Sequence, residues 1–122
     1  MLNVKKLLAK ILDSLAPAAG TTTITTSTGT LNSHQIIRCG KIRSLRLEVS
    51  KSSATSAGSN LFAGTITNAK DIPKAYATGC GYYQSSAGIM QVETTGDITV
   101  RIVGAQLAAN SKMWISVTYI AV

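Results

Sequence analysis

After residue 35, apolar and polar residues alternate with a period of two through several short segments of the chain. In the clearest of them, Leu45, Leu47 and Val49 alternate with Arg46 and Glu48. Successive side chains of a β-strand point to opposite faces, so this alternation predicts a strand with one buried and one solvated face. The same criterion predicts strands over residues 45–50, 61–67, 89–94, 98–102 and 113–119.

The segments between these strands are rich in residues that favour turns. Thr95–Gly96–Asp97 predicts a tight turn that joins two of the strands into a hairpin. Residues 68–81 contain Pro73, Gly79 and Gly81 and predict a long irregular connection, in which the two glycines form a turn before the next strand. Short strands with no later helix indicate a mainly β fold, an antiparallel sandwich or jelly roll.

The first sixteen residues follow a helical periodicity instead. Val4, Leu8, Ile11 and Leu15 recur at spacings of four, three and four, which lines one stripe of an amphipathic helix over residues 2–16. Written as heptads, the stripe has Leu at a and Val or Ile at d, a pattern that favours more than two helices. Two heptads do not associate alone in water, so something else must raise the local concentration of the helices, and a trimeric body downstream would do so.

The ends of this helix are also marked in the sequence. Asn3 is a suitable N-cap, and Pro17 ends the helix. The Thr- and Gly-rich stretch that follows favours extended chain, either a linker or a first edge strand. The chain is thereby divided into an oligomerisation helix (1–16), a linker or first strand (17–34) and a β-sandwich head domain (35–122).

Two other roles for the N-terminal helix remain open at this stage. The helix could pack on its own domain, or it could lie on a membrane surface with its lysines facing the headgroups. A secretory signal is not expected, because Lys10 and Asp13 interrupt the apolar stretch that such a signal needs.

Composition adds limits to this picture. A chain of 122 residues is the size of one ordinary domain. Charged residues make up only 14% of it, and Ser and Thr take their place, as suits a β protein on the outside of a cell or particle. No apolar run reaches the roughly 18 residues of a transmembrane helix, so a membrane span is not expected.

The net charge of +7 permits an anionic partner, such as nucleic acid, an acidic glycan or a membrane surface. A cluster of four basic residues is formed by Arg38, Lys41, Arg43 and Arg46. No run of five basic residues and no nucleic-acid-binding motif occurs, so nucleic-acid binding is not expected. A basic binder of nucleic acid or membrane remains an alternative function.

The sequence gives no support for catalysis, a cofactor or a metal. His34 is the single histidine, and we expect it to be exposed or locally hydrogen-bonded. Glu93 and Asp97 flank the hairpin turn, where Asp97 is expected to bond locally rather than act as one of a catalytic pair. Cys39 and Cys80 are expected to be small buried thiols, although a disulfide between them is possible.

Few aromatic residues are present, and three of them are candidates for contact with a receptor. Tyr82 and Tyr83 are adjacent and therefore point to opposite faces of a strand. Trp114 lies on the strand face opposite Met113 and Ile115, where it is either exposed or covered by a contact between subunits, and a second core face remains open. Exposed aromatic rings stack on sugars and bind protein partners.

Several motifs resemble the C-terminal domains of bacteriophage tail and head fibres. The passage from Leu61 to Tyr76 contains Ile-Pro-Lys-Ala-Tyr, which is similar to the Leu/Ile-Pro-x-x-Tyr passage of those domains. A Thr-Gly-Asp turn, the strand Ile98–Ile102 and a closing Ser-Val-Thr-Tyr-Ile follow it in the same order. The opening Val-Lys-Lys-Leu-Leu-Ala-Lys-Ile-Leu-Asp resembles the beginnings of prophage structural proteins, so the resemblance covers roughly residues 1–16 and 60–120.

This resemblance implies a homotrimer on the surface of a phage particle. A threefold helix bundle would stand beside three β domains, like the heads of trimeric adhesins. The protein would bind a host-surface glycan or protein, and other virion proteins would be held through the N-terminal segment. A decoration or assembly protein without a receptor role is an alternative, because the sequence lacks an extended shaft and a clear docking domain.

Overall fold

The computed structural model describes residues 3–15 and 17–122, and of residues 12–15 it describes the backbone alone. The described residues form one helix, α1 (Val4–Leu15), nine strands and one 3-10 turn, η1 (Ala69–Asp71). The strands are β1 (Ala18–Gly20), β2 (Ile24–Thr28), β3 (Thr30–Cys39), β4 (Ile42–Ser50), β5 (Asn60–Ile66), β6 (Ala77–Tyr83), β7 (Ser86–Val92), β8 (Asp97–Gly104) and β9 (Met113–Ile120).

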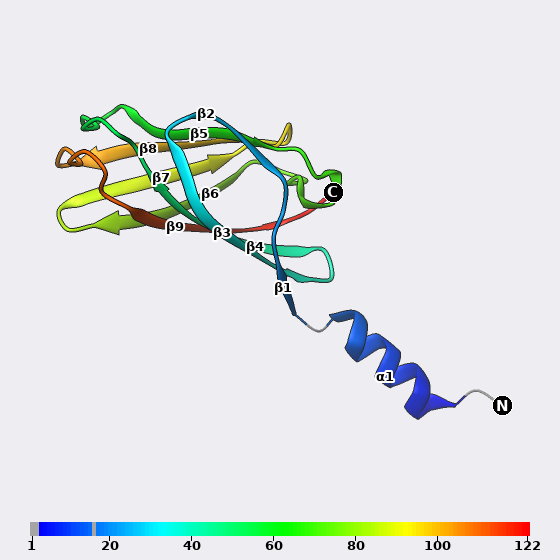
Figure 1. Ribbon diagram of the computed structural model, residues 1–122. Coiled ribbons are helices and arrows are strands. Elements are labelled where there is room, and N and C mark those ends of the chain that lie inside the picture. Colours follow the sequence, from blue (N-terminus) through cyan, green and yellow to red (C-terminus); the bar gives the residue numbers. More distant parts are fainter. Residues whose placement is uncertain (1–2, 16) are drawn as a thin grey trace.

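The strands of the described chain form one antiparallel sheet in the order β1-β3-β4-β9-β6-β7-β8-β5-β2. The sheet curls around a single core (Figure 1). The prediction of a mainly β, antiparallel body preceded by one short helix is therefore confirmed. The finer arrangement as a sandwich or jelly roll stays a prediction.

The segment expected as a linker or first strand takes part in the sheet at both of its edges. β1 pairs with β3 at one edge, and β2 pairs with β5 at the other. Between β2 and β3 the chain turns at Gly29, whose φ of 75° suits glycine. The N-terminal strands therefore bridge the open side of the curled sheet (Figure 1).

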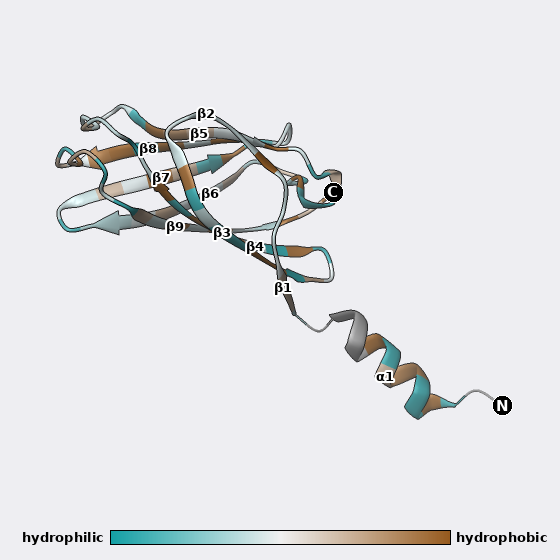
Figure 2. Ribbon diagram, in the orientation of Figure 1, coloured by the Kyte–Doolittle hydropathy of each residue, from teal (hydrophilic) through white to brown (hydrophobic). Residues whose placement is uncertain are grey.

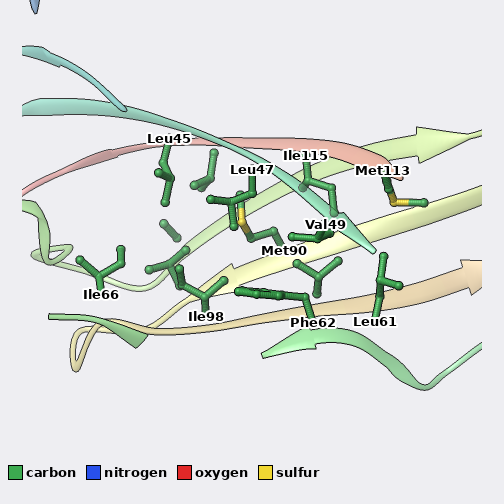
Figure 3. Close-up of a cluster of buried hydrophobic side chains, with 14 of the residues drawn as sticks. Leu45, Leu47, Val49, Leu61, Phe62, Ile66, Met90, Ile98, Met113 and Ile115 are labelled. Carbon is green, nitrogen blue, oxygen red and sulfur yellow. The ribbon is translucent and has the colours of Figure 1, made fainter. Parts of the chain in front are cut away.

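The core is filled by the inward-facing residues of the period-two segments. Leu45, Leu47 and Val49 of β4 are fully buried, and they face residues of β5, β7 and β8 across the interior (Figure 3). Full burial of one such side chain contributes about 1.5–3 kcal/mol. The core comprises Ile36, Leu45, Leu47, Val49, Leu61, Phe62, Ile66, Ala77, Met90, Val92, Ile98, Val100, Ile102, Leu107, Met113, Ile115, Val117 and Tyr119.

The structure corrects the prediction for residues 68–81. They do not form one irregular connection up to residue 81, because strand β6 begins at Ala77 and includes Gly79 and Gly81. A Cβ atom at either glycine would overlap a backbone carbonyl of β9, that of Ser116 or that of Trp114. The two glycines therefore allow β6 and β9 to approach closely, and they do not form a turn.

Helix α1 begins as the sequence predicts. The Asn3 side-chain oxygen accepts a hydrogen bond of 3.2 Å from the backbone N–H of Lys6, which is the geometry of an N-cap. The helix projects away from the sheet (Figure 1), and all of its described side chains are exposed. Among residues 3–15 and 17–122 there is no helix long and apolar enough to cross a membrane.

Candidate assembly and binding surfaces

The apolar stripe of α1 lies in solvent. Val4 is 69% exposed, Leu8 54% and Ile11 46%, and Leu7 beside them is 43% exposed. The side chain of Leu15, the fourth residue of the predicted stripe, lies outside the described residues. Figure 2 shows the apolar residues of the helix well away from the sheet, so the arrangement of a helix packed on its own domain is not the one observed.

A second exposed apolar surface lies on the outer face of the sheet. Ile42 and Ile120 are paired across β4 and β9, and they are 50% and 59% exposed. Ile42 follows the β3–β4 turn, and Ala18, at the start of β1, pairs with Arg38 just before that turn. The apolar pair is therefore at the end of the body from which the helix leaves (Figure 1).

Of the three aromatic residues that the sequence nominates, two lie near each other and the third points elsewhere. Tyr82 and Trp114 occupy outward positions on the neighbouring strands β6 and β9, and the pairing of Gly81 with Ile115 sets them across from each other. Tyr83 points to the other side and lines a depression at the end of the curled sheet with Gln84 and Ser86. Trp114 lies, as predicted, on the face opposite Met113 and Ile115, and it is 40% exposed while they are buried.

Trp114 carries a cation on one face of its ring. The guanidinium carbon of Arg46 lies 4.3 Å from the ring centroid, within the range of a cation–π contact. Beside the pair is an open groove of about 410 Å³ on the outer face. The groove is lined by Gln35, Ile37, Ser44, Arg46, Trp114, Ile115 and Ser116.

An ion cluster that the sequence did not reveal links four segments of the body. Asp71, fully buried at the end of η1, accepts hydrogen bonds from Arg38 Nε and Nη2 at 2.9 and 2.6 Å. Arg43 Nε donates to the same carboxylate at 2.9 Å. Tyr119 O–H donates to the backbone carbonyl of Asp71 at 2.6 Å. The cluster thus ties β3, β4 and β9 to the turn that leads into β6.

The cluster also shifts the acidity of its members. Burial by itself would raise the pKa of Asp71, but the hydrogen bonds from its donors, led by Arg38, lower it to about 2. Burial, together with the negative charge of Asp71, raises the pKa of Tyr119 to about 12. The carboxylate is therefore charged and the phenol neutral at physiological pH.

This cluster includes two of the four basic residues that the sequence groups over 38–46. Arg38 and Arg43 share one carboxylate, and Arg43 is buried. The Lys41 amine donates to the backbone oxygen of Val122 at 3.0 Å. Since only Arg46 of the four faces the outer groove, they do not form one continuous cationic surface, which weakens the alternative of a nucleic-acid or membrane binder.

The other polar candidates make local contacts. His34 Nε2 lies 3.1 Å from the backbone N–H of Thr22 and 2.9 Å from its carbonyl. Asp97 accepts from the hydroxyls of Thr65 and Thr95 at 2.8 and 2.9 Å, in keeping with a role in the hairpin turn. The expectation of buried thiols is wrong for Cys80, which is exposed on the outer face of β6.

The cysteines are not joined to each other. Cys39 is half-buried near the β3–β4 turn, and no disulfide links it to Cys80. No group of three or more His, Cys, Asp or Glu side chains in the described part of the chain is arranged to hold a metal ion.

Neither a scan of protein-family models nor a search of curated proteins finds a match to this sequence.

Proposed function

We propose that the chain is a structural protein of a bacteriophage particle. In this proposal it forms a homotrimer through α1 and presents its β body, a sandwich or jelly-roll-like head, at the virion surface. The head attaches to a glycan or protein on the bacterial surface, and the N-terminal segment contacts other virion proteins. The resemblance of residues 1–16 and 60–120 to fibre proteins supports the particle and the receptor role.

The main support for the proposed homotrimer is the solvent-exposed apolar stripe of α1. The β body buries its own core, whereas Val4, Leu7 and Leu8 project from a helix that extends away from it. A helix of 12 residues is marginal in water without a partner. Association with the same helix of other copies would cover the stripe and stabilise the helix.

The surface area that a stable contact must bury indicates that the β body also contributes to the interface between copies. A stable interface buries roughly 800 Å² on each partner, more than the stripe of a three-turn helix offers. Ile42 and Ile120 lie at the end of the body nearest the helix and would extend the contact between copies. Repetition of a shallow receptor site on three subunits would then increase attachment through avidity.

Replacing Leu8 by glutamate should convert the trimer into a monomer. A carboxylate at an a position would be buried among apolar side chains at the threefold axis, which is strongly unfavourable. Light scattering on a sizing column should give a mass near three times 12.7 kDa for the natural protein and near 12.7 kDa for Leu8→Glu.

Ala9→Glu is the matched control. Ala9 is also exposed, and its replacement adds the same charge at a b position outside the stripe. It should remain trimeric. A monomeric natural protein would contradict the proposal, and so would Leu8→Glu and Ala9→Glu of equal mass.

A further inference from the structure

The groove beside Trp114 contains an arginine whose hydrogen-bonding capacity is unused. Three arginines lie in the segment 38–46, and two of them are held by Asp71. Within the described residues, Arg46 makes no hydrogen bond or ion pair, although Glu48 lies two residues away on the same strand face. Its contact is with the ring of Trp114, which holds the guanidinium in place and leaves its N–H groups available.

We propose that this groove binds the carboxylate of an acidic sugar. The inference rests on the proposed receptor role and names the chemical class of the receptor. A planar guanidinium donates two parallel hydrogen bonds to a carboxylate, and the stacking on Trp114 fixes the fork before the ligand arrives. Such preorganisation lowers the entropic cost of binding.

The rest of the lining fits a sugar ring. Gln35, Ser44 and Ser116 supply an amide and two hydroxyls, which match the hydroxyl groups of a pyranose. Ile37 supplies apolar surface for the C–H faces of the ring, and Trp114 supplies an aromatic edge. A groove of about 410 Å³ is within the usual size range of small-ligand sites.

The charge of the groove favours a sugar carboxylate over a polyphosphate backbone. Nucleic acids are bound by several cations spread along the phosphates, whereas Arg46 is the single cation in this lining. Glu48, directly opposite Trp114 in the register of β4 and β9, would further repel a ligand of high negative charge. One carboxylate on a largely neutral molecule is the anion that this arrangement accepts.

The test uses the full-length protein and its single tryptophan as the reporter. Fluorescence of Trp114 is titrated with a uronic-acid trisaccharide, with a sialylated trisaccharide, and with the carboxyl-reduced form of each. At least one acidic sugar should change the emission, and its reduced form should bind about tenfold more weakly or worse, because a charge-assisted hydrogen bond is lost.

Three variants locate the site. Arg46→Gln should weaken binding of the acidic sugar about tenfold or more, whereas Arg101→Gln, which removes the same charge from an exposed position on β8, should leave it unchanged. Glu48→Gln should tighten binding about two- to fivefold by removing a repulsive surface charge.

Several results would overturn the inference. They are equal binding of the reduced sugar, an equal loss in Arg101→Gln, equal binding of a glutamate tripeptide, or no response to either acidic sugar. Protection of Trp114 from acrylamide quenching in the natural protein would show that the groove is a contact between subunits. If the sugars fail while the protein is trimeric and binds host cells, this inference alone is wrong; if the protein is a monomer without host binding, the proposed function is wrong.

Discussion

Asp71→Ala should destabilise the folded protein by about 3–5 kcal/mol, the usual consequence of removing one partner from a buried ion pair. The loss arises mainly at Arg43, which is buried and would keep its charge without the carboxylate that it now contacts at 2.9 Å. Urea unfolding followed by circular dichroism measures the effect as a lower midpoint with an unchanged slope.

Asp97→Ala is the matched control for this variant. Asp97 is also a carboxylate that accepts two hydrogen bonds, but it is exposed at the hairpin turn, so its loss should cost about 1 kcal/mol or less. If Asp71→Ala unfolds at the same urea concentration as Asp97→Ala, the buried cluster does not stabilise the body.

The acid stability of the natural protein provides a second readout of the same residue. The pKa of Asp71 is about 2 in the folded state and near 3.9 in an unfolded chain, so its contribution is fully present above about pH 4. As the pH falls toward 2 the carboxylate takes up a proton, and about 2 kcal/mol of the free energy of unfolding should be lost. That part of the pH dependence should be absent from Asp71→Ala.

Gly81→Ala should have an effect of similar size through a different cause. The added methyl group would overlap the carbonyl oxygen of Trp114, a backbone atom that cannot rotate away. Strands β6 and β9 must separate there, and the pairing between Gly81 and Ile115 is lost. We expect the free energy of unfolding to fall by about 3 kcal/mol or more. Thermal unfolding measures it as a lower melting temperature.

Gly20→Ala serves as the matched control for Gly81→Ala. Gly20 also lies in a strand, but a Cβ there would meet only a side-chain atom, Nη1 of Arg38, at 3.4 Å. Because this distance is an ordinary van der Waals contact, the melting temperature of Gly20→Ala should change little. Equal stability of Gly81→Ala and Gly20→Ala would contradict the close approach of β6 and β9.

The sequence predicted those parts of the fold that depend on local pattern. Leu45, Leu47 and Val49 are buried because strand geometry alone assigns them to one face, and the same rule places Trp114 outside. Asn3 caps the helix because capping needs only residues three positions apart. Such features require no knowledge of which strands are neighbours.

Features that depend on strand order were beyond the reach of local pattern. Local pattern assigns Gly79 and Gly81 to a turn, because their actual role depends on the approach of β9, more than 30 residues later. The cluster of Arg38, Arg43 and Asp71 was missed because Asp71 lies 28 positions from the nearer arginine. Tyr82 and Trp114 were nominated separately, and only the pairing of β6 with β9 places them together.

The position of β9 has a consequence for synthesis of the protein on the ribosome. β9 lies between β4 and β6, so it joins the strands β1, β3 and β4 to the other half of the sheet. The other strands of the described chain leave the exit tunnel before β9, and its partner β4 precedes it by more than 60 residues. The two halves of the nascent sheet therefore have no shared central strand until β9 has emerged, and the emergence of β9 starts the closure of the sheet.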